Sequence, residues 1–461
     1  MSNDNGAAEL RAAWDDLIAR LQEARNAIDD PALYPPPPSE RVLAEGYRYV
    51  LGFLYGSIQR VLGPSVEHPL FQRAIQPLNR STIDNADAVY LCAPIDGNYS
   101  YRIRARAADT RHWRGEARVP GLQAAPQYVI FEAPSGYAGD SGSIREMAPG
   151  SRTNCGTLDS SAIQVQPDGS FEILLAPERP AGYTGNFIAT RATRSRTQKD
   201  GSTVTRDYVS RFVVLREIFY DWENERLLDL DISRLDRHGE HPAALDTSNA
   251  VRQIREIGYL TRNQVHFWNE FYAVAMEVYG DMNGDGKCFI PRNGFNAPNA
   301  AGLATGGGMS TNIYCGGIYE LADDEAMIVE LRQPVEPDYI GFHLANMWGE
   351  SPDFANHQCS LNAFQADRDA DGVFRYVIAH RDPGIANWVD TTLLPEGYMS
   401  VRWAYGNKPT EPELMPSATA TKIRFDQIGA HLPAARRVSE QERRAVIRTR
   451  QRHVQYRYRQ H

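Results

Sequence analysis

The chain has 461 residues, of which 42% are hydrophobic, and a formal net charge of -9 at pH 7. This length accommodates two or three domains with sizeable cores. The acidic balance predicts a soluble protein and argues against nucleic acid as the main partner.

The compartment that we expect is the cytoplasm. Five cysteines are scattered along the chain without a CxxC pair, which is typical of a reduced intracellular protein. The first residues include Asp4, Glu9 and Asp15 and show no basic region followed by an apolar one, so we expect no signal peptide. No apolar run approaches the roughly 18 residues that a membrane-spanning helix needs, and we expect no membrane span.

Residues 1–80 are predicted to form a helical segment. Between about residues 8 and 27, apolar residues recur at helical spacing, namely Leu10, Trp14, Leu17, Ile18 and Leu21. Four prolines from Pro35 to Pro38 then form a stiff spacer. Ser39 is expected to cap a second helix, which Gly63 and Pro64 end.

Residues 81–240 consist of short β-rich runs separated by turn residues, which predicts an antiparallel sandwich or jelly roll. A helix and a Gly/Asn-rich loop are expected within 241–320, followed by a second β module at 321–430. Residues 431–461 are predicted to form a basic C-terminal helix. The predicted fold class is therefore mainly β with flanking helices.

The second β module repeats a pattern of the first. The stretch Asp84 to Leu91 reappears as Asp323 to Leu331, and Asp168-Gly169-Ser170-Phe171 returns as Asp371-Gly372-Val373-Phe374. The pairs Asn186-Phe187 and Asn387-Trp388 follow at similar distances, and runs that contain Arg216 and Arg402 close the two copies. Because a solenoid needs three or more units, two copies predict two related β modules.

Several blocks in this order resemble a large uncharacterised bacterial family, the domain-of-unknown-function family numbered twelve-fourteen. The blocks are Glu45 to Tyr49, Tyr90 to Pro94, Pro167 to Phe171, Arg216 to Glu223, His343 to Asn346, Ser360 to Asn362, Asp371 to Phe374, Ala379 to Gly384 and Asn387-Trp388. The resemblance implies a jelly-roll-like core with helices and a link to bacterial catabolism of steroids, terpenoids or aromatics. It implies no catalytic mechanism.

The second module gathers polar and titratable residues that suit a ligand cleft. A histidine titrates near neutral pH, and a nearby carboxylate can orient it as a general base. We predict His343 as this base, with Glu350 or Asp353 orienting it, and His357 as a second acid or base. The predicted substrate contacts are Asn346, His380, Asn387, Trp388 and Arg402. The alternative for each residue is a structural hydrogen bond at a turn. For Asn387 we favour this alternative, because Asn186 occupies the matching place in the first copy.

One segment has the spacing of a calcium loop. Asp281, Asn283 and Asp285 place oxygen ligands at alternating positions, and Gly286 follows at the expected sharp turn. The twelfth position holds Arg292 instead of the glutamate of a complete EF-hand. An atypical Ca²⁺ site and a plain Asx/Gly loop therefore both remain open.

Two functions from different classes remain open as well. The leading hypothesis is a cofactor-independent enzyme that performs hydrolysis, hydration or elimination on a hydrophobic small molecule. The alternative is a noncatalytic ligand-binding protein or a self-assembling scaffold. In either case we expect a homo-oligomer. The arginine-rich stretch from Arg436 to Arg459 either covers an apolar surface of its own chain or contacts an anionic partner or another subunit.

Overall fold

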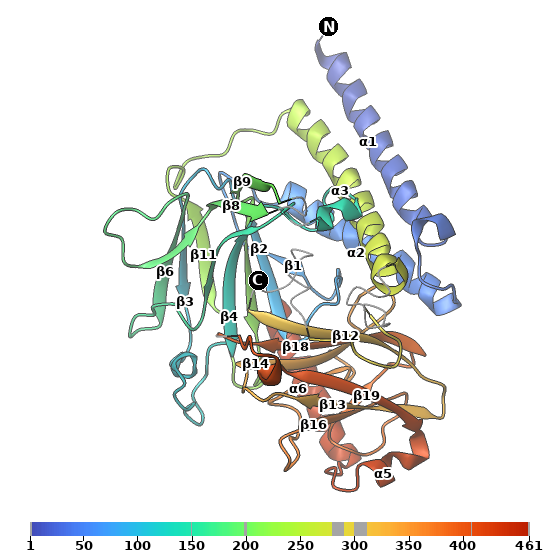
Figure 1. The fold of residues 1–461 in the computed structure, drawn as a ribbon. Helices are drawn as coiled ribbons and strands as arrows, with labels where there is room; N and C mark the ends of the chain where they lie inside the picture. Colours follow the sequence, from blue (N-terminus) through green and yellow to red (C-terminus); the bar gives the residue numbers. More distant parts are fainter. Residues whose placement is uncertain are drawn as a thin grey trace.

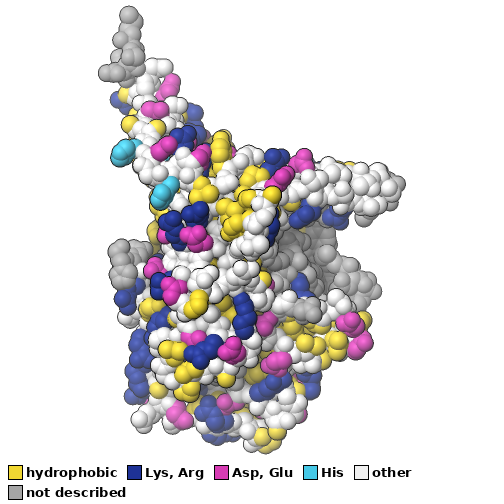
Figure 2. Space-filling view, turned by 90° about the vertical axis from the view of Figure 1, so that its left-hand side faces the viewer, with side chains coloured by type: hydrophobic (Ala, Val, Ile, Leu, Met, Phe, Trp, Pro, Cys, Tyr) yellow, Lys and Arg dark blue, Asp and Glu magenta, His cyan; other side chains and the backbone are white. Residues whose placement is uncertain are grey.

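The fold consists of two β-sandwiches and a layer of helices. The computed structural model describes residues 2–148, 150–197, 201–278, 290–298, 311–406 and 408–459. Figure 1 shows the first sandwich at the left, the second at the lower right, and the long helices above. On the face shown in Figure 2, acidic and basic side chains are interspersed, with apolar side chains grouped between them. The predicted class, mainly β with flanking helices, is confirmed.

Three long helices form the helical layer: α1 (Ser2–Asn26), α2 (Glu40–Leu62) and α3 (Thr247–Ala273). The short helix η1 (Pro31–Leu33) follows α1, and a π-helix (Val274–Val278) extends α3. Ser39 begins α2 as predicted, because its side chain accepts a hydrogen bond from the Val42 N–H. The buried faces of these helices pack against Trp348 and Tyr398 of the second sandwich. Within the described ranges, no helix is long and apolar enough to cross a membrane.

The first sandwich packs a sheet of order β1-β2-β10-β4-β5 against one of order β11-β3-β6-β7. Its strands are β1 (Gln72–Ile75), β2 (Ala88–Pro94), β3 (Tyr101–Arg106), β4 (Tyr128–Pro134), β5 (Asn154–Asp159), β6 (Ser170–Ala176), β7 (Asn186–Ala189), β10 (Phe212–Ile218) and β11 (Asp229–Arg234). A separate two-stranded ribbon is formed by β8 (Arg191–Thr197) and β9 (Thr203–Val209). All of β4 is buried, because both faces of its sheet are covered.

The second sandwich packs β12-β18-β14-β15 against β17-β16-β13-β19. Its strands are β12 (Asn312–Glu320), β13 (Glu325–Arg332), β14 (Tyr339–Ala345), β15 (Ser360–Asn362), β16 (Phe374–Ala379), β17 (Trp388–Asp390), β18 (Glu396–Ala404) and β19 (Ser417–Arg424). The helices α5 (Ile428–His431) and α6 (Glu440–Tyr458) follow. Each sandwich contains one parallel pair, β6 with β7 and β16 with β17, where we expected antiparallel strands throughout.

The two sandwiches share one topology, which corrects part of the predicted repeat. In order, β2 to β7, β10 and β11 occupy the places of β12 to β19. The Asp-Gly and Asn blocks are correctly aligned, because they lie at β6 and β7 and at β16 and β17. The stretch Asp84 to Leu91 enters β2, whereas Asp323 to Leu331 enters β13, the counterpart of β3. That part of the alignment is wrong by one strand.

Equivalent faces of the two sandwiches meet at a contact that we call the seam. Residues of β2, β4 and β10 share an apolar cluster with Tyr339 of β14 and Ala404 of β18. Strand registers relate the residues of the two faces as Tyr90 with Tyr314, Tyr128 with Tyr339, Glu132 with His343, and Arg216 with Arg402.

Asn186 and Asn387 have the same structural role in the two copies. The side-chain oxygen of Asn186 accepts a hydrogen bond from the Gln164 N–H, and that of Asn387 accepts one from the Asp367 N–H. Each amide nitrogen donates to two backbone carbonyls. The predicted structural role is confirmed, and these contacts satisfy the amide that we had also considered for substrate.

Candidate functional site

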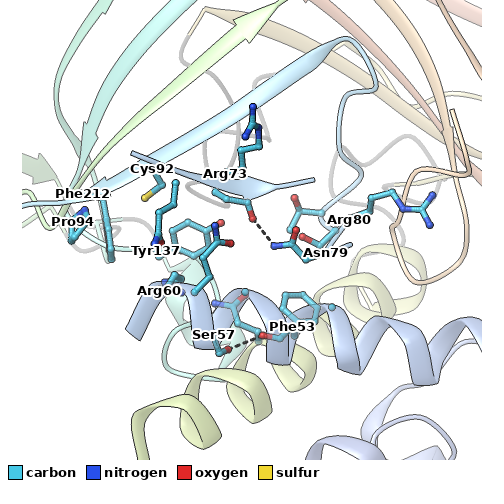
Figure 3. Close-up of a pocket in the computed structure, with 18 of the residues that line it drawn as sticks. Phe53, Ser57, Arg60, Arg73, Asn79, Arg80, Cys92, Pro94, Tyr137 and Phe212 are labelled. Atoms are coloured by element: carbon cyan, nitrogen blue, oxygen red, sulfur yellow. Dashed lines mark hydrogen bonds between the residues drawn. The ribbon is translucent and has the colours of Figure 1, made fainter. Parts of the chain in front are cut away.

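A pocket lies between α2 and the first sandwich, and we call it the α2 pocket. The centre of a water-sized sphere can occupy about 70 Å³ of it, within about 780 Å³ of space between atoms that includes open solvent. Its lining combines ten polar or charged residues with seven apolar or aromatic ones, namely Phe53, Pro64, Ala74, Cys92, Pro94, Tyr137 and Phe212. Figure 3 shows Cys92, Tyr137 and Phe53 around one space, whereas Arg73 and Arg80 extend away from it. Most of the surface that these residues expose in the hollow is apolar, which is usual for a small-molecule site.

Two glycines shape the pocket wall on α2. A Cβ on Gly52 would lie 3.3 Å from the Asn79 Cα, and one on Gly56 would lie 3.2 Å from the Asn79 Nδ2. The Asn79 amide donates to the Ala74 carbonyl at 2.9 Å and fixes the chain that faces the helix. The spacing of these glycines by one helical turn therefore allows the backbone to approach α2 closely.

Three arginines line the pocket, and each has a partner within the chain: Arg73 and Arg80 donate to the carbonyls of Arg457 and Ser351, and Arg60 forms an ion pair. Arg60 donates to both carboxylate oxygens of Asp140 at 3.0 Å, and its guanidinium lies 4.5 Å from the centre of the Tyr137 ring. Burial raises the pKa of the Cys92 thiol to about 12 and that of the Tyr137 hydroxyl to about 12. Both groups are therefore protonated at neutral pH, and the pocket offers them as hydrogen-bond donors.

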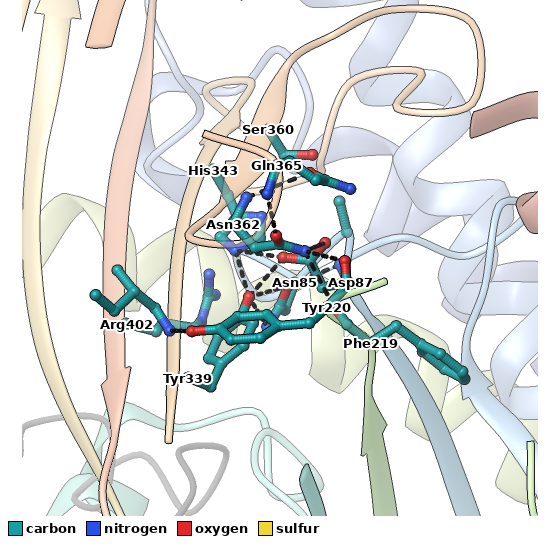
Figure 4. Close-up of polar contacts among 12 residues, drawn as sticks. Asn85, Asp87, Phe219, Tyr220, Tyr339, His343, Ser360, Asn362, Gln365 and Arg402 are labelled. Atoms are coloured by element: carbon teal, nitrogen blue, oxygen red, sulfur yellow. Dashed lines mark hydrogen bonds and ion pairs between the residues drawn. The ribbon is translucent and has the colours of Figure 1, made fainter. Parts of the chain in front are cut away.

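The predicted base, His343, lies in the seam (Figure 4). Its Nε2 is 3.1 Å from the Tyr339 hydroxyl and 3.7 Å from Asp87 Oδ2, and the residue is 1% exposed. Burial lowers the pKa of His343 well below its usual range, and the nearby charges of Arg402 and Arg450 add to this effect. The imidazole is therefore neutral and buried between the two sandwiches.

Asp87 is the acceptor at the centre of this network. It is 0% exposed and accepts hydrogen bonds from Tyr339 at 2.6 Å, from Trp222 at 2.9 Å and from Asn362 at 3.0 Å. Burial raises the pKa of Asp87, while the Tyr339 bond and the charges of Arg457 and Arg450 act in the opposite direction. Sequence patterns missed this residue, because it lies 252 positions from Tyr339.

The helix α6 completes the seam. Its residues Arg450 and Arg457 are fully buried, and their guanidinium carbons lie 4.7 and 4.4 Å from the centre of the Trp222 ring. Arg450 donates to the carbonyls of Phe354 and Ser360, and Arg457 donates to that of Ala86. Of the two interpretations of the arginine-rich stretch, these residues follow the first, since they cover apolar surface of their own chain.

The acids that we expected beside His343 have other partners. Glu350 accepts from the Asn346 amide at 3.0 Å, and burial raises the pKa of Glu350 to about 7. Asp353 accepts from the Asn356 side chain at 2.7 Å. The predicted orientation of His343 by Glu350 or Asp353 is therefore wrong, because its carboxylate neighbour is Asp87.

His357 forms a separate pair with an acid that we had not considered. Its Nδ1 lies 2.8 Å from Asp390 Oδ2, and the side chains are 44% and 12% exposed. A carboxylate that orients a partly exposed imidazole is an arrangement used in general acid–base catalysis. The structure thus divides the predicted catalytic cluster between the seam and a partly exposed His–Asp pair.

The remaining predicted substrate contacts bind atoms of their own chain. His380 lies 2.7 Å from the Thr391 hydroxyl, and the Trp388 indole donates to the Ala379 carbonyl at 3.0 Å. Arg402 donates to the Ile83 carbonyl in the seam. These contacts hold turns and strands together.

The calcium hypothesis is not tested by the structure. Asp281, Asn283 and Asp285 lie outside the described residues. In the part of the chain that is described, no group of three or more His, Cys, Asp or Glu side chains is arranged to hold a metal ion.

Comparison with known proteins supports the fold alone. No protein-family model matches the chain, and a search of curated proteins finds no match. The crystal structure of an uncharacterised protein from Burkholderia cenocepacia is similar, with a TM-score of 0.71 and 21% identity over 92% of this chain and 100% of that one. The VPA0106 protein from Vibrio parahaemolyticus matches with a TM-score of 0.39 and 9% identity over 87% of this chain and 100% of that one, which supports no inference.

Replacing Tyr339 by Phe is expected to destabilise the protein by about 2–3 kcal/mol, because the Asp87 carboxylate loses its shortest hydrogen bond inside the seam. The matched control is Tyr376→Phe, since the Tyr376 hydroxyl is buried without a hydrogen-bond partner among the described residues. Urea denaturation monitored by circular dichroism measures both variants. Equal losses in the two variants would show that the Tyr339 hydroxyl is not important.

The variant Glu350→Gln is expected to change how stability depends on pH. The pKa of Glu350 is raised from 4.5 to about 7 in the folded state. Its contribution to the free energy of unfolding is therefore complete below about pH 4.5 and is lost as pH rises through 7. Relative to Glu350→Gln, the wild type should lose on the order of 2–3 kcal/mol between these limits. Urea titrations at several pH values measure the difference, and parallel curves would contradict the raised pKa.

Proposed function

We propose that the protein binds a hydrophobic small molecule in the α2 pocket. The observation that carries this proposal is a hollow whose exposed surface is mainly apolar, with amide side chains of Asn79, Gln72 and Gln264 at its wall. None of the predicted catalytic residues is among those that line it. The thiol and phenol that do line it are protonated, so binding is better supported there than acid–base chemistry.

The ligand class follows from the lining together with the family resemblance. Tyr137, Phe212 and Phe53 offer flat apolar surfaces beside Arg60, whose charge Asp140 compensates. The other two arginines of the lining extend away from this space (Figure 3). We include in the proposal the relationship to family twelve-fourteen, which links the chain to steroid-, terpenoid- or aromatic-like molecules in bacterial catabolism.

Binding is tested by titrating the protein with the fluorescent probe N-phenyl-1-naphthylamine and displacing it with androstenedione, geraniol or 1-naphthol. Saturable binding is expected for the wild type. The variant Cys92→Phe should weaken it at least tenfold, because the added ring occupies the pocket. Val119→Phe, on the exposed surface, is the matched control and should bind normally. Absence of saturable binding, or equal affinity in both variants, would reject the proposal.

A second candidate function rests on the His357–Asp390 pair, which supports an acid–base hydrolase. If this pair is catalytic, hydrolysis of 4-nitrophenyl butyrate should fall by about 10² or more in His357→Ala, the range typical for loss of a general acid or base. The exposed His431→Ala serves as control, and melting temperatures establish that both variants fold. Activity that survives in His357→Ala, or no turnover by the wild type, removes this candidate and leaves the binding proposal intact.

A further inference from the structure

The ribbon of β8 and β9 is an exposed part of the fold. Nearly all of its residues are exposed, apart from those at its base. There, the Tyr208 hydroxyl donates to the Gly150 carbonyl at 2.6 Å. An isolated two-stranded hairpin is only marginally stable in water, because it buries little apolar surface. A ribbon of this kind gains stability when another surface covers it.

One face of the ribbon carries an unfavourable arrangement of charge. In the strand register Arg194 lies directly opposite Arg206, and Arg196 lies two residues further along the same face. Like charges placed directly opposite each other destabilise a strand pair. Within the residues that the structure describes, none of these three arginines forms an ion pair. The other face is uncharged over much of its length, with a hydroxyl pair of Ser195 and Thr205 at 2.8 Å.

The charge of the ribbon is opposite to that of the rest of the chain. Residues 191–209 include five Lys or Arg and two Asp, which gives them a net charge of +3. Because the whole chain has a net charge of -9, the other residues together carry -12. An acidic body repels phosphate polymers and anionic membranes, while it attracts a basic arm. The exposed Arg444 and Arg452 of α6 pair with Glu440 and Glu223, and Arg450 and Arg457 of the same helix are buried. The ribbon differs from α6 because one of its faces holds three exposed arginines that form no ion pair among the described residues.

We propose that the ribbon is an association arm whose arginine face docks on the acidic body of a second copy of this chain. Docking places carboxylates beside Arg194 and Arg206 and relieves their mutual repulsion. Association through such a surface depends on charge, so it weakens as salt is added.

Analytical ultracentrifugation of the full chain at low and high NaCl concentration tests this arm. The wild type should associate at low salt and dissociate at high salt. Arg194→Glu/Arg206→Glu should weaken association at least tenfold, whereas Arg194→Lys/Arg206→Lys should retain it. Ser195→Glu/Thr203→Glu adds acidic groups to the opposite face of the same ribbon and should also retain it. Thermal melts show whether each variant folds.

Several outcomes would overturn the proposal. One is a wild type that stays monomeric at every concentration, and another is a Glu variant that associates as well as the wild type. The third outcome concerns other partners, which are represented by a labelled DNA duplex and by vesicles of phosphatidylcholine and phosphatidylserine. Binding of a monomeric wild type to either probe, lost in the Glu variant, would assign the ribbon to nucleic acid or to a membrane instead.

Discussion

The structure depends on one buried carboxylate, that of Asp87. An unpaired charge inside a protein costs several kcal/mol, so its surroundings must supply donors. Tyr339 and Asn362 of the second sandwich and Trp222 of the first supply them, and two arginines of α6 add positive charge nearby. Segments far apart in the sequence must therefore assemble in one arrangement before the charge is compensated. Any displacement of one sandwich against the other would remove some of these donors and leave the Asp87 carboxylate uncompensated in the interior.

Local patterns predicted the elements of the fold, because each depends on neighbouring residues. Helical spacing and a serine cap located α2, and Asp-Gly turns with a following asparagine aligned β6 and β7 with their counterparts. The block from Asp84 was displaced by one strand, since an acidic turn before an apolar run precedes β2 and β13 alike. Such a pattern marks the start of a strand, but the identity of the strand depends on its pairing partners.

The candidate sites were harder to predict for the same reason. His343 and Arg402 were recognised as polar residues on strands, but their partners Asp87 and Ile83 lie in a segment some 250 to 320 positions away. The lining of the α2 pocket resembles ordinary core in sequence, because Phe53, Tyr137 and Phe212 would suit either. The one local signal was the pair Gly52 and Gly56, since a helix rarely carries two glycines on one side without a close neighbour.

The two matched faces at the seam resemble the interface of a symmetric dimer whose subunits have become one polypeptide. In a true dimer both subunits have the same sequence, so a change on one side is imposed on the other. A tandem chain is free of that constraint, and positions such as Glu132 and His343, or Asp159 and Asn362, now differ in chemistry at equivalent places. In the first half Glu132 forms an ion pair with Arg216, whereas the second half has the neutral imidazole of His343 at the place of Glu132.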